Sequence, residues 1–89
     1  MRDLRGRAGS AIADPERERE HLAQADRHIA AGRRRVTDQV ALIARLAQDG
    51  HDTTEARRLL MMLEETLDEW RVHRQLILGA IARLTAATP

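Results

Sequence analysis

The sequence contains no cysteine, phenylalanine or tyrosine, every one of its 15 basic residues is arginine, and a single tryptophan is its only aromatic residue. Without cysteine, neither disulfide bonds nor thiolate metal sites can stabilise a chain of 89 residues. The lack of aromatic residues leaves aliphatic side chains and methionine to form the core, which suits packed helices. The use of arginine alone fits a GC-rich, bacterial genome.

Charge excess and long apolar runs are also missing. The 15 arginines face 14 acidic residues, for a net charge of +1, whereas nucleic-acid-binding domains usually show a clustered basic excess. The longest apolar run, residues 76–82, is far shorter than the ~20 residues of a membrane span. The N-terminus has no apolar segment of the kind found in secretory signals. We therefore expect a cytoplasmic protein that binds neither membranes nor nucleic acid.

Capping signals divide the chain. Asp14 followed by Pro15 is typical of a helix start. Gly50 reads as the residue just after a helix end, and Asp52 with Glu55 reads as a capping box for a second helix. The sequence therefore predicts a flexible basic tail over 1–13 and a hairpin over 14–89, with a helix over 14–49, a turn over 50–52 and a helix over 53–87.

Apolar residues recur with alternating three- and four-residue spacing in both predicted helices, which indicates a coiled-coil-like seam. Two such seams facing each other define an all-α fold of two long antiparallel helices. The residues expected in its core and interface are Leu22, Ile29, Gly32, Val36, Ile43, Leu60, Leu63, Leu67, Trp70, Arg74, Ile77 and Ile81.

Folding the chain about residue 51 makes two specific predictions. Trp70 falls opposite Gly32, so the glycine would leave room for the indole ring. Arg74 occupies a seam position where an apolar residue is expected, and a buried guanidinium needs an acidic partner, for which Asp26 is near enough. A polar group at such a position commonly fixes register and oligomeric state, so Arg74→Leu should change the association state.

The second predicted helix carries more apolar residues than one seam uses. The surplus residues are Leu59, Met61, Met62, Val72, Leu76 and Leu78. Small domains without disulfides often bury such additional apolar residues by self-association. We therefore expect a homodimer that forms a four-helix bundle through the second helix. Binding of a different protein to this surface is the alternative.

His28 is the one candidate for chemistry. The string from His28 to Gly32 resembles histidine phosphotransfer domains, in which an exposed histidine precedes a small glycine by one helical turn. That resemblance implies a phospho-acceptor role for His28, although Ala31 stands where those domains usually carry lysine. Glu18 and His21 have the Glu-x-x-His spacing of di-iron bundles, but the other ligands of such a site are missing. We expect no metal site, no cofactor and no catalytic residue.

Several segments of the chain resemble a set of small, uncharacterised bacterial proteins. They are residues 27–32, 39–46, 50–53, 59–60, 64–67 and 73–74. The resemblance covers most of residues 20–80 and implies a helical hairpin of bacterial origin, without an activity. The sequence thus favours a non-enzymatic interaction or assembly module that self-associates. The alternative is a part of a two-component signalling system, with His28 accepting a phosphoryl group or the bundle docking a receiver domain.

Overall fold

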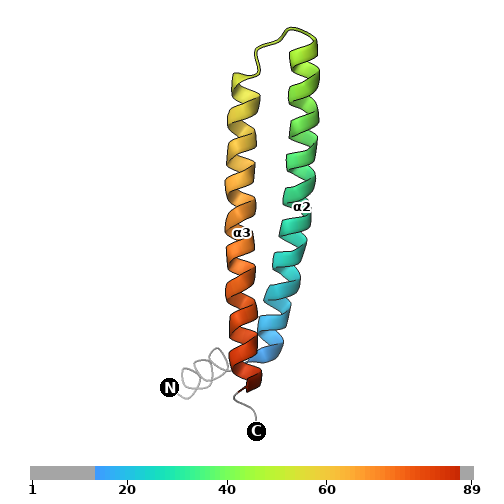
Figure 1. Ribbon diagram of the computed structural model, residues 1–89. Coiled ribbons are helices and arrows are strands. Elements are labelled where there is room, and N and C mark those ends of the chain that lie inside the picture. The colour runs from blue at the N-terminus through green and yellow to red at the C-terminus, as the bar shows by residue number, and fades with distance from the viewer. Residues whose placement is uncertain (1–13, 87–89) are drawn as a thin grey trace, which may run out of the picture.

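A computed structural model describes residues 14–86, which form two long helices, α2 (Pro15–Gln48) and α3 (Thr54–Ala86). The helices run antiparallel and pack against each other along their length, with the connection at one end of the hairpin (Figure 1). No strand occurs among these residues. The predicted all-α fold of two packed helices is confirmed. The tail predicted over 1–13 and the last residues of the second predicted helix lie outside the described part of the chain.

The start of α2 is fixed by Asp14. Its backbone is extended, and its carboxylate accepts hydrogen bonds from the backbone N–H groups of Glu16 and Arg17, at 3.1 and 3.2 Å. These bonds satisfy two of the donors that a helix start leaves without intrahelical partners. Pro15 has no N–H to satisfy, and the acidic Glu16 and Glu18 oppose the positive end of the helix dipole.

The end of α2 is a Schellman motif built on Gly50. Gly50 has a φ of 76°, in the left-handed region that favours glycine. Its N–H donates to the Ala47 carbonyl at 3.1 Å, and the His51 N–H donates to the Leu46 carbonyl at 2.9 Å. The glycine therefore ends the helix and turns the chain back, as its place in the sequence predicted.

The start of α3 differs from the expected capping box. The Asp52 carboxylate accepts two hydrogen bonds from Thr54, one from its hydroxyl at 2.7 Å and one from its backbone N–H at 2.9 Å. These bonds, the hydroxyl bond foremost, lower the pKa of the Asp52 carboxyl below its ordinary value. Glu55 does not reach back to Asp52, because its carboxylate pairs with Arg58 one turn further on. The reciprocal bond predicted for Glu55 was therefore wrong.

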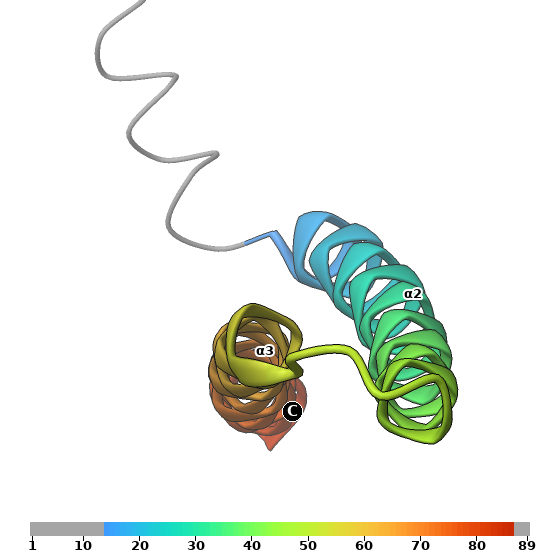
Figure 2. The ribbon, with the colours of Figure 1, turned by 90° about the horizontal axis from the view of Figure 1, so that it is seen from above.

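The interior between the helices is thin. The buried apolar residues of the described part are Ala25, Ile43, Leu67 and Ile77. Viewed from the connection, α2 is inclined to α3, and only one side of each helix meets the other (Figure 2). Each helix therefore keeps most of its circumference exposed, and the candidate sites within residues 14–86 lie on the surface.

Candidate protein interface

All twelve predicted seam residues are buried or partly buried. Ile43, Leu67 and Ile77 are buried. The remaining nine are partly buried, namely Leu22, Ile29, Gly32, Val36, Leu60, Leu63, Trp70, Arg74 and Ile81. Two residues outside that set are buried with them, Ala25 and Gln39.

Leu67, rather than Trp70, fills the space over Gly32. A Cβ added at Gly32 would lie 3.1 Å from Leu67 Cδ1, and the three heavy atoms nearest to it all belong to Leu67. The predicted match of Trp70 to Gly32 was therefore wrong by about one helical turn of α3. The reason is that α3 begins lower than the point where α2 ends (Figure 1), so simple folding about residue 51 misjudges the register. The purpose assigned to the glycine, room for a large side chain, still applies.

Trp70 lies between two histidines. Its ring stacks on the His28 imidazole from α2, with ring centroids 4.1 Å apart and planes 9° from parallel. The His73 ring meets it edge-on, with centroids 5.5 Å apart. Stacked and edge-to-face contacts between aromatic rings stabilise a structure beyond the burial of the rings. His28 is an exposed residue, yet the indole of Trp70 covers one face of its ring.

Arg74 pairs with Asp26 across the two helices. Its Nε donates to the Asp26 carboxylate at 2.6 Å, and the two side chains are 36% and 51% exposed. The acidic partner predicted for Arg74 is confirmed. Because both groups stay partly in water, the pair fixes which turns face each other more than it adds stability.

Gln39 is a register contact that the sequence did not single out. Its side chain is 8% exposed, and its amide nitrogen donates to the Ala56 carbonyl in the first turns of α3 at 2.8 Å. The sequence did hold a signal for this contact, namely a polar side chain at a seam position. A buried amide must find a hydrogen-bond partner, so such a side chain indicates a bond across the seam. Gln39 near the connection and Arg74 near the open end thus tie the helices at two heights.

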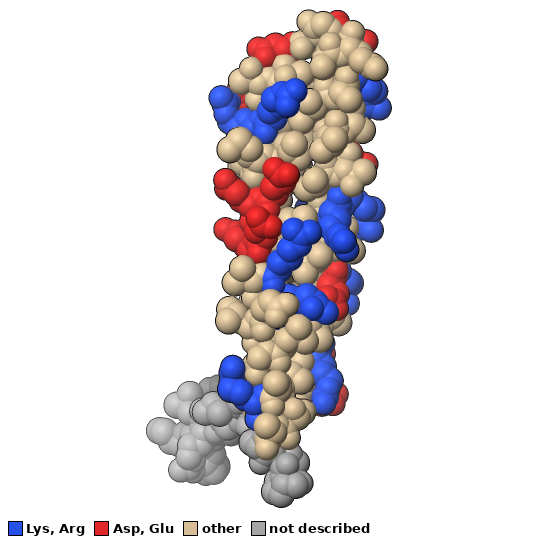
Figure 3. Space-filling view, in the orientation of Figure 1, with Lys and Arg blue, Asp and Glu red and all other residues tan. Residues whose placement is uncertain are grey.

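Two adjoining hollows between the helices are lined largely by charged side chains. The first, a shallow hollow, is lined by Asp26, Ile29, Arg33, Arg71, Arg74 and Gln75. A second hollow, lined by Val36, Glu64, Leu67, Asp68 and Arg71, adjoins it. Acidic side chains gather near the middle of α3, with arginines beside them that extend onto α2 (Figure 3). Because these hollows are open and carry charges of both signs, this side of the hairpin is a solvated surface.

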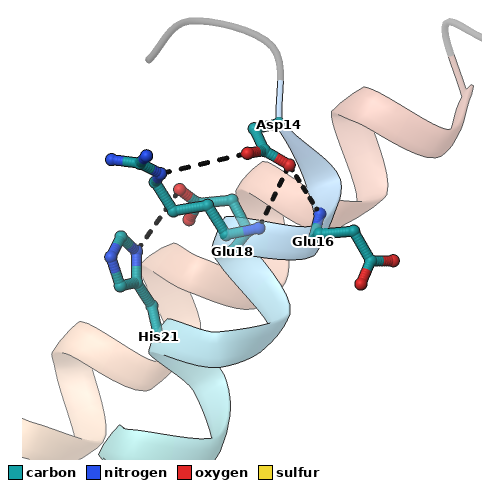
Figure 4. A network of polar contacts seen from close by, with 5 residues as sticks. Asp14, Glu16, Glu18 and His21 are labelled. Carbon is teal, nitrogen blue, oxygen red and sulfur yellow. Dashed lines mark hydrogen bonds and ion pairs between the residues drawn. The ribbon is translucent and has the colours of Figure 1, made fainter. Parts of the chain in front are cut away.

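Glu18 and His21, which have the Glu-x-x-His spacing, contact each other within the first turns of α2. His21 Nδ1 lies 3.5 Å from the Glu18 carboxylate, next to the Asp14 cap and its ion pair with Arg17 (Figure 4). Within residues 14–86, no group of three or more histidine or acidic side chains is placed to hold a metal ion. The pair is therefore part of the polar first turns of α2.

Large apolar side chains are exposed mainly on α3. Those on α3 are between 46% and 66% exposed, namely Leu59, Met61, Met62, Val72 and Leu76. On α2 the one large apolar residue of this kind is Val40, at 50%. No helix of the described part is long and apolar enough to cross a lipid bilayer.

Comparison of the chain with protein-family models, curated protein sequences and solved structures finds no significant match.

Proposed function

We propose that this protein is a non-enzymatic interaction or assembly module, in which hairpins self-associate through α3 into a four-helix bundle. The observation that carries the proposal is the concentration of exposed large apolar side chains on α3, with Val40 as the one such residue on α2. A hairpin buries one face of each helix, and four buried apolar residues make a slight core for the 73 residues that the structure describes. Association would cover the α3 surface and add a second core.

The shape of the molecule supports a binding role over catalysis. The hollows between the helices are open and lined by charged side chains that already pair with neighbours, such as Arg74 with Asp26 and Arg71 with Asp68. Active sites usually lie in concave pockets that exclude water from the reacting groups. Exposed large apolar side chains rimmed by polar ones are instead typical of protein interaction sites.

The test is the mass of the protein in solution as a function of concentration. Sedimentation velocity and light scattering should show a dimer that dissociates on dilution. Leu76→Glu should shift the protein to monomer at all accessible concentrations, because it places a charge on the α3 surface. Val40→Glu is the matched control, since Val40 is also an exposed apolar residue, 50% exposed against 66% for Leu76, but lies on α2. A wild-type protein that stays monomeric at millimolar concentration would refute self-association.

The signalling alternative depends on His28 and Gly32. Leu67 occupies the space over Gly32, and Trp70 covers one face of the His28 ring, so contacts within the hairpin account for both residues. Incubation with a phosphorylated receiver domain, followed by a search for acid-labile phosphate on His28, tests this alternative. His28→Ala serves as its control.

A further inference from the structure

The outward side of α3 carries a second stripe with seam-like spacing. Residues spaced alternately by three and four positions lie on one face of a helix. Starting from Met62, this spacing selects Glu65, Glu69, Val72, Leu76, Gly79, Arg83 and Ala86, and all of them except the partly buried Gly79 are exposed. We call these eight residues the outer stripe. None of them is among the residues predicted for the seam with α2.

Gly79 is the residue of the outer stripe that the hairpin itself does not explain. A Cβ added there would meet only the Arg83 guanidinium, at 3.4 Å, which is the mobile end of a long side chain. Glycine inside a helix costs about 1 kcal/mol relative to alanine. Gly32 offsets that cost by admitting Leu67, whereas Gly79 admits nothing from α2. A bare backbone on an outward face is what close approach of another helix requires.

We propose that a second copy of this chain docks antiparallel on the outer stripe, with the two-fold axis passing α3 at the height of Arg74. This inference rests on the self-association proposed above and adds its orientation and register, with the four helices side by side in one layer rather than around a common core, because the outer stripe lies on the side of α3 away from α2. With the axis at that height, each member of the outer stripe meets another member of the stripe. Val72 faces the Leu76 position of the second copy, and Glu69 faces its bare Gly79.

Charge complementarity selects this register. The Arg83 guanidinium folds back over Gly79 in its own helix. In the antiparallel pair it comes to lie between Glu65 and Glu69 of the second copy, and the symmetry creates this contact twice. A parallel pair would instead set each glutamate against its own copy, and like charges directly opposed are destabilising. The stripe is therefore self-complementary in one orientation only.

The orientation is tested by distances between spin labels in the dimer. The chain has no cysteine, so Arg57→Cys and Gln75→Cys each give one labelling site. These exposed positions are five helical turns apart on one side of α3, off the outer stripe. At ~1.5 Å rise per residue, the proposed axis separates the two Arg57 labels by about 50 Å along the helix and the two Gln75 labels by about 3 Å.

Double electron–electron resonance should therefore give a long distance between the two labels of Arg57→Cys and a short distance between the two labels of Gln75→Cys. Short distances for both would show a parallel pair and overturn this inference while self-association stands. A monomer by sedimentation at the labelling concentration would overturn the inference together with the proposed function.

Two further variants test the contacts. Gly79→Leu should raise the helix content, because leucine is a better helix former, and yet weaken dimerisation about tenfold or more by blocking close approach. Arg83→Glu should weaken the dimer, and the second change Glu65→Arg should restore it, since the pair would be exchanged rather than lost. A dimer unaffected by Gly79→Leu, or a double variant no tighter than Arg83→Glu alone, would contradict the register.

Discussion

Gly32→Ala sets two effects of known size against each other. Alanine stabilises a helix interior by about 1 kcal/mol relative to glycine. The added methyl group would lie 3.1 Å from Leu67 Cδ1, closer than ordinary van der Waals contact, while its distances of 3.8 and 3.9 Å to Leu67 Cβ and Cγ are normal. Only one terminal methyl group has to move, but it belongs to a buried residue.

The structure therefore predicts a near cancellation. Extra methyl groups in a packed core cost about 1–3 kcal/mol, and a single contact of this kind lies at the low end of that range. Gly32→Ala should change the free energy of unfolding by less than about 0.5 kcal/mol, since the propensity gain and the contact penalty are of similar size. Gly79→Ala is the matched control, because its new methyl group meets only the end of the Arg83 side chain. It should stabilise the monomeric hairpin by about 1 kcal/mol.

The assay is urea unfolding followed by circular dichroism at 222 nm, at a concentration where the protein is monomeric. A change of 1 kcal/mol corresponds to about 4–8 °C in Tm for a domain of this size. A double-mutant cycle isolates the contact: in a Leu67→Ala background, Gly32→Ala should regain its full stabilisation of about 1 kcal/mol. Equal stabilisation by Gly32→Ala and Gly79→Ala in the wild-type background would refute the packing of Leu67 on Gly32.

Two other contacts give predictions of their own. Gln39→Ala should destabilise the hairpin by about 1–2 kcal/mol in urea unfolding, because the buried hydrogen bond to the Ala56 carbonyl is lost with its packing. Gln75→Ala, at an exposed position, should change the free energy of unfolding by no more than about 0.5 kcal/mol. Equal effects of the two substitutions would contradict the buried bond. The bonds from Thr54 lower the pKa of Asp52, so the stabilisation is present above the ordinary pKa of 3.8 and is lost as pH falls through the lower folded-state pKa. The Tm difference between wild type and Asp52→Ala should therefore be constant near neutral pH and shrink below pH 3.8, and a difference independent of pH would argue against these bonds.

The antiparallel arrangement has a consequence for assembly. Pairing through the outer stripe places both α3 helices inside the four-helix unit and both α2 helices outside. The charged side formed by residues such as Arg33, Arg71 and Glu64 then stays accessible in the dimer. A further protein would meet a polar surface there, so contacts with it would depend on salt concentration.

The sequence by itself determined that the described part of the chain forms two helices, and it determined how the first of them begins and ends. Asp14 and Pro15 start one helix and Gly50 ends it, because capping bonds and a positive φ are local requirements that a few adjacent residues satisfy. The three-four spacing likewise selected residues that are buried or partly buried, since helical periodicity is a property of the chain alone.

Only the tertiary structure decided the register between the helices. Capping by Asp52 was predicted, but whether Glu55 reaches back or pairs with Arg58 depends on side-chain competition within one turn. Leu67 over Gly32 and Trp70 against His28 depend on how the connection sets the relative heights of α2 and α3, and a shift of one turn gives Gly32 a different partner across the seam. Periodicity tells which side of a helix is buried, whereas the height at which two helices meet is a property of the packed pair.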